Sequence, residues 1–344
     1  MTVDSGVLAG VVGGPVRRLE RLKGGYSREM WSFDADLDGR ERPLILCADL
    51  PSGVVGSADS LGREAEARLL AGLHAAGLPV PGVLTSGGIG SPLGRPFLVM
   101  DRVPGTASVG PLLRDPHHLV RRDALGEQLA TVLAAVHAVD LPAVVGPPPA
   151  PGDIAPAEVA RWARALDTVP DARTPAVRAA QRWLDGHRPP SPDRVVLVHG
   201  DYRTGNIVHG PKGFRAVLDW EMAHAGDPLE DLTYAALSCW RLGTGLVGGL
   251  VPVDRWVELY ERDASHPVDR SALEFWTVLG AVKMAALTRR VLDRLGPGRE
   301  RDLLRRLSEQ LDDDLRGAGS PRPTTPASLQ WVTVPVQPVA RDQE

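Results

Sequence analysis

The sequence predicts an α+β protein of two lobes, in which a small strand-rich part is followed by a larger and mostly helical part. Short β-like apolar runs fill residues 19–103, whereas segments with helical periodicity fill residues 104–316. The 344 residues, of which 43% are hydrophobic and 24% charged, are enough for a sizeable core. Residues 1–18 are expected to form an N-terminal extension. Residues 317–344 lack periodicity and are expected to form a mobile tail.

The composition excludes several classes of protein. A net charge of −4 gives no reason to expect a nucleic acid or an anionic membrane as partner. No apolar segment approaches the ~20 residues that a membrane span needs, and residues 1–14 lack the basic flank of a secretory signal. The two cysteines, Cys47 and Cys239, cannot build a disulfide framework, which favours a reducing, cytoplasmic location. No feature predicts an oligomeric interface.

Three strands are expected early in the first lobe, at residues 19–23, 30–35 and 44–48. The turn between the first two is rich in glycine and consists of Gly24, Gly25, Tyr26 and Ser27. Because glycine has no Cβ, such a turn lets backbone N–H groups approach phosphate oxygens. An ordinary hairpin turn explains the same four residues equally well.

A helix is expected over residues 61–76, with Glu64 near its start. Its apolar residues recur at a spacing of four and so share one face; they are Leu61, Ala65, Leu69 and Leu73. Strands are expected after residue 78 and at residues 97–100. The lobe then ends at a segment that consists of Asp101, Arg102 and Val103, followed by Pro104 and Gly105.

The second lobe alternates between long helices and one group of short strands. Helices are expected at residues 119–139, 159–166, 177–184, 229–241, 253–263, 271–295 and 299–315. A strand at residues 195–198 leads into His199, and a hairpin joins residues 207–209 to residues 214–218. The candidates for an acceptor pocket are residues 238–241, Phe275, Trp276 and Lys283, although core packing would account for each of them.

The residues after the strand at 195–198 predict a phosphoryl-transfer site. Asp201 is followed five positions later by Asn206, the spacing of a loop in which the carboxylate accepts the proton of an attacking hydroxyl and the amide holds a metal. The hairpin folds Asp219 back beside Asn206 as a second metal ligand. Carboxylate and amide oxygens are the ligands that Mg²⁺ prefers. The two aspartates could instead serve turns or helix caps.

The run His199-Gly200-Asp201 with Asn206, together with Asp219-Trp220-Glu221, resembles the aminoglycoside phosphotransferase and choline kinase group, which are relatives of protein kinases. Residues 218–232 look most like the branch with kinase-like domains associated with acyl-CoA dehydrogenases. The resemblance spans residues 19–311. It implies a bilobed protein-kinase-like fold, with a small N-terminal antiparallel-sheet lobe, a larger helical C-terminal lobe, and ATP and Mg²⁺ as cofactors.

The resemblance also implies roles for residues of the first lobe. The turn at residues 24–27 would cover ATP, and Glu64 would pair with a basic residue on the preceding strand. Here the chain departs from the family, because Cys47 occupies that basic position. Either Arg42, Arg63 or Arg28 compensates, or nucleotide binding is weakened. The backbone of Asp101, Arg102 and Val103 would hydrogen-bond adenine, with Met100 and Phe97 as apolar neighbours.

Three further residues are expected to support the site. His199 stands where protein kinases carry their catalytic-loop histidine. Glu221 would support the loop that carries Asp219, which we call the metal loop after its expected role. Asp227, followed by Pro228 and Glu230, reads as an N-cap that starts a helix and has no need of a catalytic role.

The expected function is the ATP-dependent transfer of a γ-phosphoryl group to a hydroxyl of a small molecule, such as a hydroxyacyl-CoA or a lipid-derived alcohol. An alternative acceptor is an aminoglycoside, for which Glu258, Glu261 and Asp263 could line an acidic pocket or a solvated helix face. A different class, a nucleotide-binding pseudokinase that regulates a partner, is motivated by Cys47. The complete set of Asp201, Asn206 and Asp219 weighs against it.

Overall fold

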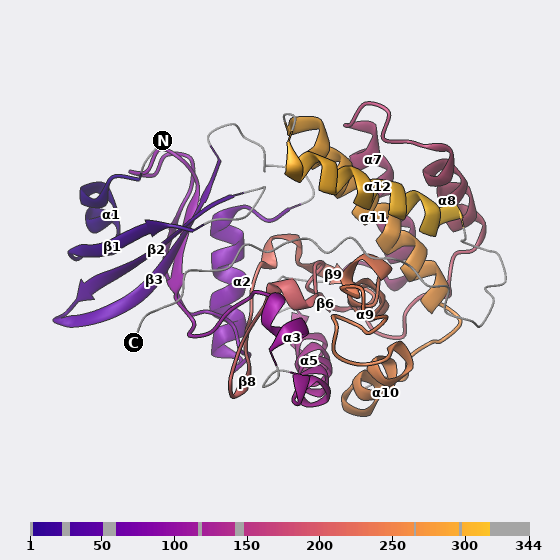
Figure 1. The fold of residues 1–344 in the computed structure, drawn as a ribbon, viewed down its shortest axis with the longest axis horizontal. Coiled ribbons are helices and arrows are strands. Elements are labelled where there is room, and N and C mark those ends of the chain that lie inside the picture. Colours follow the sequence, from indigo (N-terminus) through magenta and orange to yellow (C-terminus); the bar gives the residue numbers. More distant parts are fainter. Residues whose placement is uncertain are drawn as a thin grey trace.

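The structure, a computed structural model, describes residues 3–22, 28–50, 60–115, 119–141, 148–264, 266–295 and 298–316. Figure 1 shows two lobes, with the sheet in one and most of the helices in the other. The bilobed α+β fold is therefore confirmed. The glycine-rich turn at residues 24–27 and the expected tail at residues 317–344 lie outside the described residues.

The N-terminal lobe contains a five-stranded antiparallel sheet with the order β1-β2-β3-β5-β4. Its strands are β1 (Val16–Arg21), β2 (Arg28–Leu37), β3 (Arg40–Asp49), β4 (Val83–Gly87) and β5 (Phe97–Asp101). Helix α1 (Ser5–Val12) packs on one face of this sheet through the buried Leu8 and Val12. The boundary expected at residue 19 falls inside β1, and α1, which lies within the expected extension, packs on the sheet.

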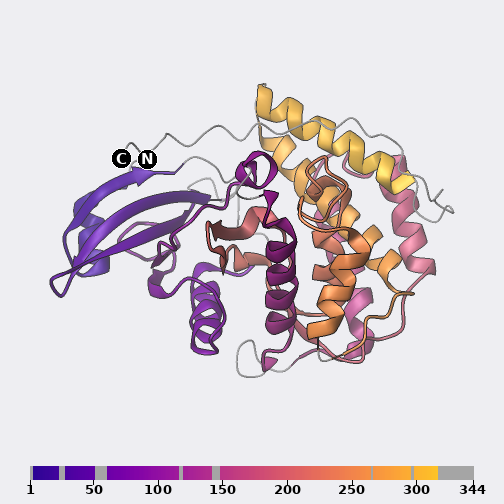
Figure 2. The same ribbon diagram turned by 60° about the horizontal axis from the view of Figure 1, so that its bottom comes forward.

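Strand register decides which side chains face the second lobe. In the β2–β3 pair, Arg28 lies opposite Asp49 and Met30 lies opposite Cys47. Because alternate side chains of a strand point to opposite faces, Arg28, Met30 and Cys47 share one face, while Leu46 packs with α1 on the other. Helix α2 (Arg63–Ala75) contacts β4 and β5 and lies between the sheet and the second lobe (Figures 1 and 2).

The C-terminal lobe is a bundle of helices around a large apolar core. Its helices are α3 (Gly110–Arg114), α5 (Arg122–His137), α7 (Ile154–Asp167), α8 (Pro175–Gly186), α9 (Pro228–Ala235), α10 (Val253–Asp263), α11 (Leu273–Arg294) and α12 (Arg299–Arg316). Helix α11 packs against α7, α8, α9 and α12. Three fully buried tryptophans, Trp162, Trp256 and Trp276, fill this core. No helix in the described part of the chain is long and apolar enough to cross a bilayer.

Two short antiparallel pairs lie beside this bundle and carry the loops of interest. Strand β6 (Val196–Val198) pairs with β9 (His224–Gly226), and β7 (Ile207–Gly210) pairs with β8 (Gly213–Val217). Short 3₁₀ turns η2 (Thr204–Asn206) and η3 (Trp220–Met222) connect these strands, whereas η4 (Ser238–Trp240) follows α9 and η1 (Pro151–Asp153) precedes α7. The expected hairpin is therefore present, and it returns the chain from Asn206 to Asp219.

Candidate active site

The loop that follows β6 is held in place by a buried carboxylate. Asp231, on α9, accepts the backbone N–H groups of His199 at 2.6 Å and Gly200 at 2.9 Å. Its other contact is the ring of His137, at 3.3 Å from Nε2. Asp231 is not among the site residues expected from the sequence, although it lies in the first turn of the helix that Asp227 caps. The loop thus enters the site with its backbone already fixed.

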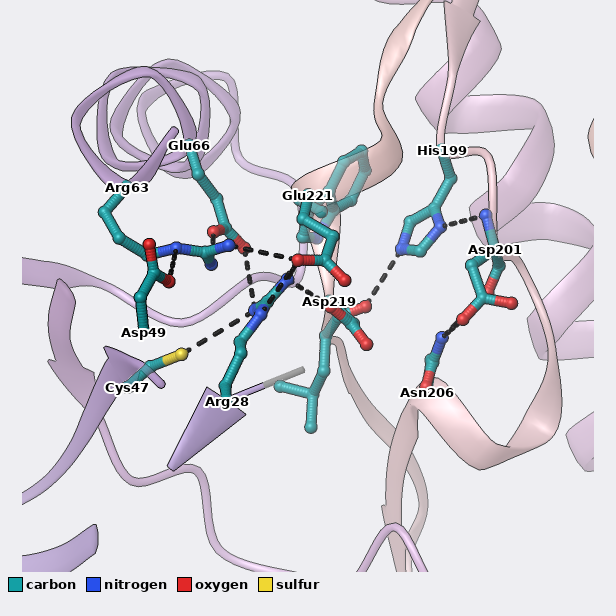
Figure 3. A network of polar contacts seen from close by, with 12 residues as sticks. Arg28, Cys47, Asp49, Arg63, Glu66, His199, Asp201, Asn206, Asp219 and Glu221 are labelled. Carbon is teal, nitrogen blue, oxygen red and sulfur yellow. Dashed lines mark hydrogen bonds and ion pairs between the residues drawn. The ribbon is translucent and has the colours of Figure 1, made fainter. Parts of the chain in front are cut away.

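His199 connects the two halves of the site. The backbone N–H of Asp201 donates to Nδ1 of His199 at 3.1 Å. Since Nδ1 accepts, the ring proton lies on Nε2, which donates to the carbonyl of Leu218 at 2.9 Å. The ring is buried and packs against Trp220. His199 therefore joins the loop of Asp201 to Leu218, the residue before Asp219 (Figure 3). It supports the positions of both aspartates.

Asp201 accepts hydrogen bonds from two side chains of its own loop. Asn206 Nδ2 donates to its carboxylate at 2.6 Å and to its carbonyl at 2.9 Å, and Arg203 Nε lies 3.1 Å from the other carboxylate oxygen. The amide of Asn206 is thus oriented by its nitrogen, so its oxygen is left for another ligand. The guanidinium of Arg203 lies over the ring of Trp240 at 4.4 Å, which places an aromatic surface next to the expected base.

Asp219 lies at the end of the hairpin, next to Asn206. The backbone N–H of Leu218 donates to the carbonyl of Asn206 at 2.8 Å, and Asp219 itself has a left-handed backbone, with φ of 67°. Such a conformation is uncommon for a residue other than glycine and is frequent at functional sites. Burial raises the pKa of Asp219, but Arg28 and Arg203 outweigh that effect, so its pKa lies below the usual value. The carboxylate is ionised at neutral pH.

The oxygens of this site fit a Mg²⁺ ion. The ion pair between Arg28 Nη2 and Asp219 Oδ1, at 2.7 Å, does not have the alignment of a hydrogen bond. Both atoms are buried, and neither has a hydrogen-bond partner among the described residues. The ionised carboxylate of Asp219 and the amide oxygen of Asn206 are hard-oxygen donors of the kind that Mg²⁺ prefers. Asn206 and Asp219 are thus the side chains that would hold the metal.

A cluster of opposite charges connects this metal loop to the N-terminal lobe, and Figure 3 shows its members. Glu221 Oε2 pairs with Arg63 Nη2 at 3.0 Å and also with Arg28. Arg63 in turn pairs with Asp49 at 2.9 Å and with Glu66. Burial and the nearby Asp219 raise the pKa of Glu221 more than Arg28 and Arg63 lower it, so its pKa lies above the usual value. Glu221 therefore supports the loop by joining it to α2 and the sheet.

The glutamate of α2 that pairs with an arginine of the sheet is Glu66 and not Glu64. Glu64 is exposed on α2, whereas Glu66 is 2% exposed and contacts Arg28 at 3.5 Å. The buried side of α2 carries Leu69 and Leu73, and Glu66 lies three and seven positions before them. The spacing of that buried face is the signal that selects Glu66 over Glu64.

The segment between the lobes differs in part from what the sequence predicts. The N–H groups of Asp101 and Arg102 donate to the carbonyls of Gly82 and Pro43, at 2.8 and 3.0 Å, so they are used within the sheet. The side chain of Asp101 pairs with Arg42 at 2.7 Å. Within the described ranges the N–H of Val103 has no partner. Among the N–H groups of this segment, that of Val103 is therefore the one available to adenine, and the expected contact of the segment with adenine stays a prediction.

Met100 remains a candidate neighbour for adenine. It lies opposite Ile45, and Ile45 lies opposite Ser32, so Met100 is on the sheet face that carries Arg28. Its side chain is half-buried and packs against the larger core. Phe97 lies on the other face, with α1, and does not join it. The four residues of the glycine-rich turn lie outside the described chain, so their expected contact with ATP stays a prediction.

Asp227 is the N-cap of α9, as the sequence predicts. Its Oδ1 accepts the N–H of Leu229 at 2.8 Å, Pro228 occupies the first helical position, and the side chain is 3% exposed. Burial raises the pKa of Asp227 to about 7, against the lowering effect of that hydrogen bond and with a further increase from Glu230. Asp227 supports the site through α9, which carries Asp231.

A second charged cluster lies behind the loop, around Lys283. Its Nζ pairs with Glu230 at 2.9 Å and donates to the carbonyl of Gly200. His224 contacts Glu230 at 3.1 Å and Glu158 at 3.6 Å; burial lowers its pKa, but the two acids outweigh burial and raise it. Although ligand atoms of Glu158, His224 and Glu230 lie within 4.8 Å of one another, Glu230 is paired with Lys283 and Glu158 with Arg161. Lys283 is 1% exposed and is not a pocket residue.

The fold and the site define a class of protein, the kinase-like phosphotransferases that act on small molecules. A family model described as the phosphotransferase enzyme family matches residues 18–276, and the chain belongs to that family. Among solved structures, a thermostable mutant of aminoglycoside phosphotransferase APH(4)-Ia in ternary complex with AMP-PNP and hygromycin B has a TM-score of 0.65 at 20% identity; the match covers 93% of this chain and 99% of that chain.

Curated relatives match through only part of their length. Acyl-CoA dehydrogenase family member 10 of Mus musculus is 35% identical over 204 residues, which are 58% of this chain and 18% of that protein. Acyl-CoA dehydrogenase family member 11 of Gallus gallus is 36% identical over 174 residues, which are 47% of this chain and 21% of that protein. The matched region thus spans about a fifth of these relatives. The similarity is to the branch that the sequence motifs indicate.

Proposed function

We propose that this small-molecule kinase transfers the γ-phosphoryl group of ATP to an alcohol, with Asp201 as the general base and with Asn206 and Asp219 as the metal ligands. The observation that carries the proposal is the junction of the two loops, in which His199 and the Leu218 N–H hold Asp219 next to the pair formed by Asp201 and Asn206. Phosphoryl transfer depends mainly on such positioning and on charge neutralisation.

The residues of the chain have separable tasks in this reaction. Asp201 accepts the proton of the acceptor hydroxyl while the new oxygen–phosphorus bond forms and the bond from the γ-phosphorus to the β–γ bridging oxygen breaks. Asn206 and Arg203 keep the carboxylate oriented through their contacts at 2.6 and 3.1 Å. Mg²⁺, when bound, would neutralise phosphate oxygens. A general base of this kind contributes roughly 10²–10⁴-fold in rate.

The acceptor that we favour is a hydroxyacyl-CoA or another lipid-derived alcohol. The support is the identity of 35% and 36% to parts of two acyl-CoA dehydrogenase family members. The aromatic ring of Trp240 beside Arg203 offers apolar surface and positive charge near the base, which suits an acceptor that is both apolar and anionic.

The acids that motivated an aminoglycoside acceptor are engaged elsewhere. On α10, Glu258 pairs with Arg255 at 3.3 Å, Glu261 with Arg270 at 2.8 Å and Asp263 with Arg262 at 2.8 Å. These contacts describe a solvated helix face with neutralised carboxylates. An aminoglycoside therefore ranks second as acceptor, supported by fold likeness to the APH(4)-Ia complex alone.

Product formation tests the proposal directly. The protein is incubated with Mg²⁺-ATP and a pool of hydroxyacyl-CoAs, choline-like alcohols, sugars and aminoglycosides, and phosphorylated products are sought by mass spectrometry. We expect a product from the hydroxyacyl-CoA group, and we expect Asp201→Asn to reduce its formation at least 10²-fold while nucleotide binding is kept. Nucleotide binding without a product in the pool, and without any effect of Asp201→Asn, would favour a pseudokinase instead.

A further inference from the structure

The sheet face toward the site carries its positive charge on β2, where Arg28 lies, and not on β3. Arg28 and Cys47 are diagonal neighbours on that face, because Arg28 lies opposite Asp49 and Met30 lies opposite Cys47. The guanidinium passes over the thiol, with Nη1 at 3.7 Å from Sγ (Figure 3). A small residue at position 47 leaves the space that the Arg28 side chain occupies.

Arg28 extends across the site from the sheet to the metal loop. Its ion pairs join Glu66 on α2, at 3.5 Å, to Asp219, at 2.7 Å, and also include Glu221. The side chain is 8% exposed, and desolvation of a charge to this degree is unfavourable unless partners compensate it. Arg28 is therefore a built feature of the site and not a surface charge that happens to point inward.

The two other candidate arginines, Arg42 and Arg63, do not contact Asp219. Arg42 has the same parity on β3 as Leu44 and Leu46, so it lies on the α1 face, where it pairs with Asp101. Arg63 is on the correct side, but its three contacts are Asp49, Glu66 and Glu221. Of the three candidates, Arg28 is the one that contacts Asp219.

We propose that Arg28 binds the phosphates of the nucleotide and replaces, from β2, the basic residue that the chain lacks at position 47. The inference rests on the proposed function. Four carboxylates, Asp49, Glu66, Asp219 and Glu221, share two guanidiniums in this cluster, which leaves an excess of negative charge that a divalent cation would neutralise. When phosphate enters, Arg28 Nη2 exchanges Asp219 for a phosphate oxygen and frees that carboxylate for the metal.

The first test measures nucleotide binding and does not depend on turnover. The Kd of Mg²⁺-AMP-PNP is determined by calorimetry for the full chain and for Arg28→Met. We expect an increase of about 10- to 100-fold in Kd, the range for losing charge-assisted hydrogen bonds. Arg40→Met, an exposed arginine at the far end of β3, is the matched control and leaves Kd unchanged. Equal affinity of wild type and Arg28→Met would overturn the inference.

A double variant tests whether basic side chains at positions 28 and 47 bind the same phosphates. Adding Cys47→Lys to Arg28→Met places an amine on β3 next to the vacated space. We expect the double variant to bind Mg²⁺-AMP-PNP at least fivefold more tightly than Arg28→Met. Failure of the lysine to recover any affinity would overturn the claim that position 47 and Arg28 are equivalent. If wild type itself binds no AMP-PNP, the proposed function fails, which is a separate result.

A third variant decides the matter if Arg28→Met does not fold. Asp219→Asn removes the carboxylate that holds Arg28 Nη2, so we expect the affinity for metal-free ADP to rise about three- to tenfold, while the gain in affinity from Mg²⁺ is lost. A residue with only a structural role would leave metal-free affinity unchanged or lower. Either of those two results would contradict the exchange of Asp219 for phosphate.

Discussion

At the scale of single residues, Asp227 shows how burial connects the site to pH. Its carboxylate caps α9 and is 3% exposed, and the pKa of Asp227 is raised to about 7 by burial first and by Glu230 and Asp269 next. A folded-state pKa above the ordinary value of 3.8 means that the native state binds more protons than the unfolded state. Stability contributed by this proton therefore falls as pH rises from about 4 to about 7.

Replacing Asp227 by Asn should remove this pH dependence. Asparagine keeps the oxygen that caps Leu229 but cannot ionise. We expect the free energy of unfolding of Asp227→Asn minus that of wild type to be about 2–3 kcal/mol larger at pH 8 than at pH 5. The reason is that wild type loses about 1.4 kcal/mol for each pH unit up to the pKa of Asp227. Urea unfolding at the two pH values gives the measurement.

The matched control for this prediction is Asp254→Asn, which removes an exposed carboxylate from the first turn of α10. It should leave the difference between pH 5 and pH 8 as in wild type. If Asp227→Asn and Asp254→Asn respond to pH alike, the ionisation of Asp227 does not control stability in this range.

Single residues were predicted from the sequence where a local rule applies. Asp227 is an example, because an N-cap and a following proline are local features. The position of Glu64 near the expected helix start favours it in the sequence, but the helix begins at Arg63 and its buried face passes through Glu66. A shift of two residues changes the face of a helix, and the sequence contains no cap that fixes the first turn. The contacts of Arg28 needed the strand register.

At the scale of elements, the short sheet formed by β6 and β9 sets the position of the loop that carries Asp201. Val198 lies opposite His224, and the chain turns directly afterwards at Gly200, with φ of +83°. A Cβ added at Gly200 would lie 2.5 Å from the carbonyl oxygen of Met222. The carbonyl of Gly200 also accepts from Lys283. Glycine is therefore required both by conformation and by the close approach of backbone.

Substitution of Gly200 by Ala should displace this loop. We expect the free energy of unfolding to fall by about 2–4 kcal/mol, because the backbone carbonyl of Met222 cannot give way as a flexible side chain would. Urea unfolding at pH 7 measures the loss. Gly186→Ala is the control: Gly186 is the last residue of α8, and an added Cβ there would meet no atom within 4 Å. That variant should be neutral or slightly stabilised. Equal effects of the two substitutions would contradict the argument.

Most elements were predictable because their periodicity is strong, as for α10, whose expected range of 253–263 is the observed one. Helix α9 is an exception. It ends at Ala235 instead of continuing to residue 241, because the N–H groups of Ala236 and Leu237 turn to Thr233 and Tyr234 in a tighter 3₁₀ pattern. Neither glycine nor proline marks that end in the sequence. The apolar spacing alone therefore predicts a longer helix.

At the scale of the whole molecule, two lobes were predictable from the change from strand-like to helix-like periodicity, but their contact was not. Arg28 and Glu221, which pair across the lobes, are 193 positions apart, and no local pattern relates residues so distant. The N–H of Leu61, before α2, also donates to the carbonyl of Glu221 at 2.6 Å. Together with the inter-lobe segment, these contacts couple the sheet to the helical lobe.

The coupling predicts how the molecule unfolds when the charge at Glu221 is removed. Glu221→Gln keeps the backbone contact with Leu61 but loses the ion pairs with Arg28 and Arg63, so we expect a loss of about 1–3 kcal/mol. The larger apolar core includes residues of both lobes, such as Leu69 and Leu98 of the first and Leu129 of the second. We therefore expect Glu221→Gln to unfold in one calorimetric transition with a lowered midpoint. Glu41→Gln, an exposed partner of Arg18 within the sheet, should leave the midpoint unchanged. A single unshifted transition for Glu221→Gln would show that the cluster does not couple the lobes.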